Sequence, residues 1–159
     1  MTIPKLRTLV AASFTRPADT TAYASGDLVA NSTTAGSVVA MTLSNVGNGA
    51  AISSQVRRIR ISKTGTSVTN ASFRVHLYTA LAITCANGDN GAWSTNGAAN
   101  HVGNVDVTVD QAFTDGAFGA ATTEINLIGQ NLYCLLEARG AYTPISGEIF
   151  TVTLEMHQD

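Results

Sequence analysis

The chain has few charged side chains. Of its 159 residues, Lys and Arg supply 9 and Asp and Glu 11, so charged residues make up 13% and the formal net charge is −2. Globular domains usually carry about twice that charged share, and proteins that bind nucleic acid usually display a basic patch or stripe. The composition therefore argues against a nucleic-acid partner. It is typical of a surface that lies against other protein.

Long hydrophobic runs are also missing. No stretch approaches the roughly 18 consecutive apolar residues of a membrane-spanning helix. An apolar run at 9–12 follows Lys5 and Arg7 but ends at Ser13, whereas a secretory signal needs about 7 to 15 apolar residues. We therefore expect neither a membrane partner nor a cleaved signal.

Cysteine is scarce, with 2 in the chain. Cys85 and Cys134 could form one disulfide, and the residues leave that pairing open. Without an export signal we expect reduced thiols that behave as small apolar side chains. Zinc sites need Cys and His at close spacing, which Cys85 and His101 do not offer. We expect no metal and no cofactor.

Helical periodicity is almost absent, whereas alternation with a period of two recurs along the chain. Apolar and polar residues alternate most clearly at 73–78, 105–110 and 150–156. At 56–61 the doubled arginine interrupts the alternation, which predicts a β-bulge. Weaker strands are expected at 9–14, 27–30, 37–43, 81–84, 124–127 and 132–138.

Glycines and Asn-Gly pairs separate these segments and supply the positive φ that tight turns need. About eight short strands, with no helix to cover a parallel sheet, predict an all-β fold: an antiparallel β-sandwich resembling a jelly roll. A closed eight-stranded barrel is the competing architecture. We expect one sandwich domain over residues 8–159, with residues 1–7 as an extended arm outside it. The residues at 85–104 form an unusually long loop, whose role the sequence leaves open.

Acidic side chains are dispersed. Asp106 and Asp110 lie on one face of an expected strand but about 13 Å apart, too far for a catalytic pair. We expect Glu137, Glu148 and Glu155 to lie on solvated polar faces. Oxygen ligands at 87–90 could suit calcium, but Asn and Asp also favour turns, and we expect a turn.

The three histidines do not form a recognisable catalytic pattern. His76 is expected on the surface or in an interface, because it alternates outward on its strand. We therefore expect no catalytic residues and no enzyme. A cleft uniting His76 or His101 with a carboxylate would instead favour a small β-sandwich hydrolase.

Two features could bind a partner. Arg57, Arg58, Arg60 and Lys63 form the densest run of one charge, which predicts either cross-strand pairing with carboxylates or an arginine-rich interface. Trp93 could stack on a sugar ring or anchor a protein contact, or it could be buried under its own loop.

The segment 14–30, FTRPADTTAYASGDLVA, resembles a segment of small tailed-bacteriophage virion proteins of the head decoration (cement) kind. It covers about a tenth of the chain. The resemblance implies a non-enzymatic β-sandwich or jelly-roll oligomer bound outside the capsid shell, and no catalytic residues are carried over from it.

We therefore expect a virion protein on the capsid exterior, made in the host cytoplasm, that associates as a homotrimer and binds the assembled major capsid protein. The expected contact residues are Ile3, Lys5, Leu6 and Arg7 of the arm, then Arg58 and Arg60. The alternative is a carbohydrate- or receptor-binding module of a phage fibre or spike, which would use Trp93 and also Tyr78 or Tyr142 as stacking platforms.

Overall fold

A computed structural model describes residues 6–44, 46, 53–128 and 131–158. The described residues form ten β-strands and two short 3-10 helices, with no α-helix among them. The strands are β1 (Leu6–Thr15), β2 (Leu28–Val29), β3 (Met41–Leu43), β4 (Ser53–Lys63), β5 (Ser72–Tyr78), β6 (His101–Thr108), β7 (Gln111–Phe113), β8 (Gly116–Ile128), β9 (Leu132–Ala138) and β10 (Ile149–Gln158). The 3-10 helices are η1 (Ala35–Ser37) and η2 (Ala98–Asn100).

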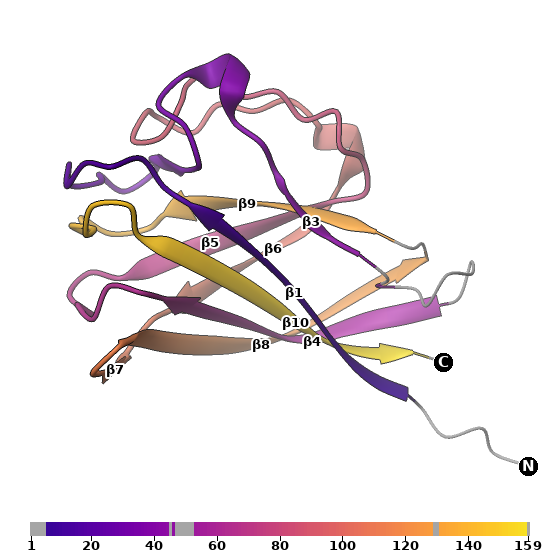
Figure 1. Ribbon diagram of the computed structural model, residues 1–159. Coiled ribbons are helices and arrows are strands. Elements are labelled where there is room, and N and C mark those ends of the chain that lie inside the picture. Colours follow the sequence, from indigo (N-terminus) through magenta and orange to yellow (C-terminus); the bar gives the residue numbers. More distant parts are fainter. Residues whose placement is uncertain (1–5, 45, 47–52, 129–130, 159) are drawn as a thin grey trace, which may run out of the picture.

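The strands build two antiparallel sheets that face each other (Figure 1). Sheet I has the order β1-β10-β4-β8-β7, and sheet II has the order β2-β9-β5-β6, with β3 also pairing with β9. The all-β sandwich expected from the alternation is therefore confirmed, with ten strands in place of about eight.

The core lies between the sheets and is filled by the inward members of the alternating segments. Phe73, Val75 and Leu77 of β5 are fully buried, as are Phe150 and the alternate residues that follow it in β10. Phe73 packs edge-on against Phe150, with ring centroids 5.2 Å apart. The period-two pattern thus identified the inner faces correctly, because successive strand residues point to opposite sides of a sheet.

The expected bulge in β4 is present at Arg57. Pairing with β8 shifts register between Val56 and Arg58, and pairing with β10 shifts between Glu155 and Met156. The extra residue lets Val56 and Ile59 both face the core, as a bulge allows.

Two expectations about the strands were wrong. Residues 81–84 form no strand and belong to a loop over sheet II. Leu6 and Arg7 do not lie outside the sandwich, since they begin β1 and pair with Gln158 and His157; residues 1–5 of the expected arm lie outside the described residues. The expected strand at 124–127 is present, as the end of the longer β8. Of the strand expected at 37–43, only 41–43 is strand, as β3.

The first half of β8 escaped notice because it is rich in Gly and Ala, which are poor strand formers. Gly119 shows why such a residue is needed: a Cβ there would lie 2.0 Å from the carbonyl oxygen of Thr108. The two sheets approach closely at this point, and only glycine leaves room for the β6 backbone.

Candidate functional site

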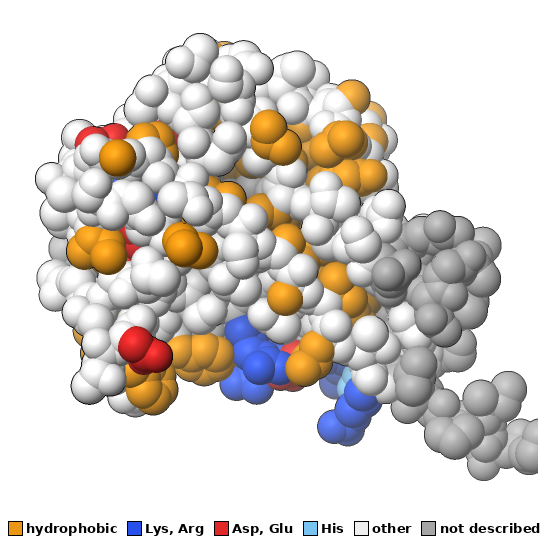
Figure 2. Space-filling view, in the orientation of Figure 1, with side chains coloured by type: hydrophobic (Ala, Val, Ile, Leu, Met, Phe, Trp, Pro, Cys, Tyr) orange, Lys and Arg blue, Asp and Glu red, His pale blue; other side chains and the backbone are white. Residues whose placement is uncertain are grey.

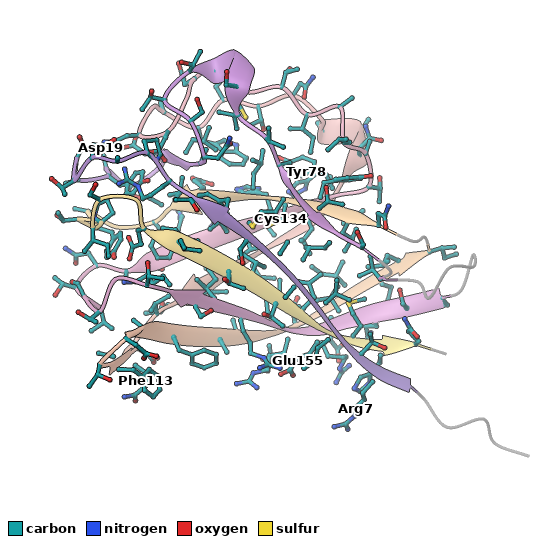
Figure 3. The ribbon with its side chains drawn as sticks, in the orientation of Figure 1. Arg7, Asp19, Tyr78, Phe113, Cys134 and Glu155 are labelled. Atoms are coloured by element: carbon teal, nitrogen blue, oxygen red, sulfur yellow. The ribbon has the colours of Figure 1, made fainter. Side chains whose placement is uncertain are left out.

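The outer face of sheet I carries most of the exposed charge singled out in the sequence. We call it the arginine face and define it by Arg7, Arg57, Arg58, Arg60, Glu124, Glu155 and His157. Figure 3 shows Arg7, Glu155 and Phe113 along this side of the sandwich, pointing away from the second sheet.

Side chains on the arginine face are organised by cross-strand pairing. Glu155 of β10 lies between two arginines of β4, with its Oε1 atom 3.2 Å from Arg58 and 2.8 Å from Arg60. At the bulge, Arg57 pairs with Glu124 of β8. The cross-strand pairing predicted for these arginines is therefore present. Four arginines face two glutamates among the described residues, so the face keeps an excess of positive charge.

Apolar side chains border the charged centre. Leu9 of β1 is 62% exposed and Phe113 of β7 is 55% exposed. Near Phe113, a hollow of about 530 Å³ also includes Phe118 and Ile149. In Figure 2 the blue arginines lie between orange side chains along the lower edge of the molecule. Arginine and aromatic side chains are both enriched in protein–protein interfaces, so their combination on this face suits contact with another protein.

A second cluster lies on the outer side of sheet II, under the loop that connects β5 to β6. His76 of β5 places Nε2 2.8 Å from Oε2 of Glu137 and Nδ1 3.2 Å from Nε2 of His101. The Trp93 indole stacks on the His76 ring, with centroids 4.0 Å apart. Arg139 donates a hydrogen bond to the other oxygen of Glu137.

This cluster corrects two expectations. His76 and Glu137 do alternate outward, but they are buried, because the loop carrying Trp93 covers that face of the sheet. His101 and Glu137 also meet His76, which is the combination that would favour a hydrolase. Both ring nitrogens of His76, however, are directed at protein groups, whereas a general base needs a nitrogen within reach of a substrate proton.

The His76 cluster predicts a loss of stability in mild acid. Burial lowers the pKa of His76 below 6.5, and His101 and Arg74 act in the same direction, against the opposing effect of Glu137. The unfolded chain then binds the proton more readily, so the free energy of unfolding falls as the pH drops through about 6.5. Urea unfolding at about pH 7.5 and 5.5 should show a larger decrease for the wild type than for His76→Asn. Equal decreases in both proteins would contradict this role of His76.

Two further polar networks are buried, and the sequence did not indicate the burial of either one. Glu148, expected on a solvated face, is fully buried beside Lys63, whose Nζ lies 3.3 Å from Oε1 of Glu148. Asp89 lies in a turn, as expected, but its side chain is buried and pairs with Arg16 at 2.9 Å. No sequence signal marked these pairs, because each joins residues more than 70 positions apart.

The other residues expected to bind a ligand, a metal or a partner lie as follows. Trp93 is half-buried with one face against His76, whereas Tyr78 and Tyr142 are buried and offer no stacking platform. Cys85 and Cys134 are free thiols, as expected. Ile3 and Lys5 lie outside the described residues. Among the described residues, no group of three or more His, Cys, Asp or Glu side chains is arranged to hold a metal ion, and no helix there is long and apolar enough to cross a bilayer.

Comparison with known proteins found no matching family model and no matching curated protein. Solved structures with a similar arrangement include a chain of the acid-stable capsid of Helicobacter pylori bacteriophage KHP30, at 10% identity and a TM-score of 0.32, covering 98% of this chain and 94% of that one. They also include the CBM35 module of Cellvibrio japonicus Abf62, at 18% identity and a TM-score of 0.36, covering 92% of each chain. These low scores carry no argument about function.

Proposed function

We propose that this protein is a non-enzymatic structural component of a phage virion. It binds the assembled major-capsid lattice on the outside of the shell and docks through the arginine face. The resemblance at 14–30 suggests the viral setting. The observation that carries the choice of surface is the excess of arginine over glutamate on one broad sheet face, bordered by exposed Leu9 and Phe113.

The partner that fits this face is an acidic protein surface. Arg58 and Arg60 share the single carboxylate of Glu155, so their guanidinium groups keep donors for carboxylates of a partner. Nucleic acid fits less well, because glutamates are interspersed with the arginines and would repel phosphates. The exposed phenyl ring of Phe113 would add apolar contact at the border.

Binding of this kind stabilises a shell by linkage. A protein that binds the assembled lattice and not the free subunits adds its binding free energy to the assembly, and the increment grows with the concentration of the free binding protein relative to its Kd. Contacts to adjacent capsid subunits then resist their separation. No chemical step is required, and a rigid sandwich is suited to hold the contact residues in fixed positions.

Cosedimentation with expanded and unexpanded capsids of the same phage tests the proposal. Replacing both Arg58 and Arg60 by Ser should weaken capsid binding at least tenfold, since about 1.4 kcal/mol of lost contact is enough for that factor. The fold should tolerate the change, because exposed ion pairs contribute about 0 to 1 kcal/mol.

The matched control is Arg74→Ser. Arg74 forms a similar ion pair with Asp106, 2.6 Å long, but on sheet II. This variant should bind capsids like the wild type. Equal binding by all three proteins would remove the arginine face from the proposal, and absence of wild-type binding to either capsid form would reject the capsid function.

Binding of a carbohydrate or a receptor stays as the alternative. It is favoured by the rigid support of Trp93, whose indole is fixed against His76 and retains some exposure. Glycan binding by the wild type that disappears in Trp93→Ala would support this alternative over capsid docking.

A further inference from the structure

Among the described residues, strand β1 lies at the end of sheet I with one edge unpaired, and this edge can be located residue by residue. The backbone N–H of Arg16 donates to the carbonyl of Glu148, while the carbonyl of Ile149 accepts from Thr64 on the opposite side of β10. Because backbone groups alternate in direction along an antiparallel pair, even-numbered residues of β1 point their N–H and C=O groups at β10. The N–H and C=O groups of the odd-numbered residues point away from β10, toward the unpaired edge. These residues are Arg7, Leu9, Ala11, Ser13 and Thr15.

This edge lacks the features that normally prevent strand addition. The ten residues of β1 include no proline, and its pairing with β10 runs without a register shift. Its one charged residue, Arg7, lies near one end. Proteins usually protect edge strands with prolines, bulges or central charges, so a long regular edge of this kind is suited to pairing with another strand.

The gap beside β1 gives a second reason for a partner. Here the two sheets leave an opening between β1 and the segment before and within β3, a hollow of about 400 Å³ lined in part by Phe14, Val39 and Met41. Val39 is 63% exposed. Figure 2 shows orange side chains exposed between white ones on the side of the molecule where β1 and β3 lie in Figure 1. A strand added to β1 would cover part of this apolar opening.

We propose that the occupant is β1 of a second copy of this chain, paired antiparallel about a two-fold axis at Ala11. In that register Ala11 faces Ala11 of the other copy, Leu9 faces Ser13, and Arg7 faces Thr15. Every residue in these pairs is odd-numbered, so the backbone N–H and C=O groups on the unpaired edges of the two copies face each other. They can form about ten backbone hydrogen bonds. The two copies of Arg7 lie at opposite ends, about 27 Å apart along the strands, and do not repel each other.

Self-pairing is favoured over a foreign strand by the side chains on this edge. The small residues Ala11 and Ser13 occupy the centre of the edge, and the charge occupies one end, so an antiparallel copy meets neither bulk nor like charge. A two-fold contact of this kind closes with two copies. It therefore predicts a dimer, which replaces the homotrimer expected from the sequence.

The dimer would also strengthen the proposed docking. A two-fold axis perpendicular to sheet I joins the two sheets into one and keeps both arginine faces on the same side. Two docking surfaces held at a fixed spacing bind a repeating lattice with a raised effective concentration. The pairing itself does not depend on the capsid proposal and is tested in solution without capsids.

Sedimentation equilibrium of the full chain and its charge variants tests the pairing. The wild type should show twice the 16.5 kDa chain mass. Ala11→Lys alone and Ala11→Glu alone should each dissociate at least tenfold more readily, because like charges then face each other across the axis. An equimolar mixture of the two variants should recover the dimer, since the opposite charges then pair.

Ser62→Lys is the matched control, because Ser62 is also exposed on the outer face of sheet I but lies on the interior strand β4. It should remain dimeric. A monomeric or trimeric wild type overturns the proposal, and so does a dimer that persists in both Ala11 variants. Failure of the mixture to recover the dimer overturns the register at Ala11. A confirmed dimer that does not bind capsids would reject the docking function alone.

Discussion

Replacing Lys63 by Met is expected to lower the free energy of unfolding by about 3 to 5 kcal/mol. The Lys63 and Glu148 side chains are both fully shielded from solvent. Lys63 donates hydrogen bonds to the carbonyls of Gly65 and Ser67 and to the hydroxyl of Tyr142. Without the ammonium group, Glu148 keeps a buried negative charge that has lost its counter-ion.

The surroundings of Glu148 make the loss hard to absorb. Its Oε1 atom accepts from the Tyr142 hydroxyl and the Gly65 backbone N–H, while Oε2 has no hydrogen-bond partner among the described residues. A buried carboxylate that is only partly satisfied has little left to compensate for the missing cation. Burial also lowers the pKa of Lys63 and raises that of Tyr142, which reflects the same poorly hydrated environment.

Urea unfolding followed by far-ultraviolet circular dichroism measures the effect. The double variant Lys63→Met/Glu148→Leu should recover much of the loss, because a buried ion pair replaced by apolar residues is often neutral. Arg74→Ser, which breaks the exposed pair with Asp106, should cost about 1 kcal/mol or less. If the free energy of unfolding of Lys63→Met lies within about 1 kcal/mol of the wild-type value, the buried ion pair does not stabilise the fold as described.

Replacing Asp89 by Ala is expected to produce the second large loss, again about 3 to 5 kcal/mol. Asp89 accepts hydrogen bonds from the guanidinium of Arg16, the hydroxyl of Tyr23 and the backbone N–H of Ala30, at 2.7 to 2.9 Å. Its removal leaves the Arg16 side chain, which is 0% exposed, without this carboxylate. Burial raises the pKa of Asp89, opposed by these three donors.

The loss should concentrate in two loops. Asp89 links the segment after β1 to the loop over sheet II, and the bridge between Asp27 and Ala92 lies next to this contact. Amide hydrogen exchange should therefore rise first at residues 85–92 and 27–31. Fluorescence of Trp93, the one tryptophan of the chain, reports on the same loop.

Asp19→Asn provides the matched control. Asp19 also binds Arg16, at 3.1 Å, but its side chain is 36% exposed, so the change should cost about 1 kcal/mol or less. The stability loss of Asp89→Asn should lie between those of Asp89→Ala and Asp19→Asn, because the amide keeps one hydrogen-bond acceptor but has no charge. Equal stability of Asp89→Ala and Asp19→Asn would contradict a special role for the buried carboxylate.

The candidate surface could be predicted in part. Arg58 and Arg60 follow the alternation of β4, so their exposure on one face was evident from the sequence. Their shared partner Glu155 lies 95 or more residues away and was expected only as an isolated charge. Leu6 and Arg7 were expected in the arm because Pro4 and two nearby charges are typical of an extended segment. In the structure both residues pair with the end of β10, so β1 begins at Leu6.

The sequence by itself determined the sandwich, the inward faces of its clear strands and the bulge at Arg57. These depend on the alternation of side chains along an extended backbone, which is a local property. Only the tertiary structure decided which polar residues are buried. Glu148 and Asp89 are removed from water beside partners more than 70 residues away, and His76 is covered by the loop that folds back over its own strand. Desolvation depends on this folded arrangement, and the alternation of side chains along one strand does not encode it.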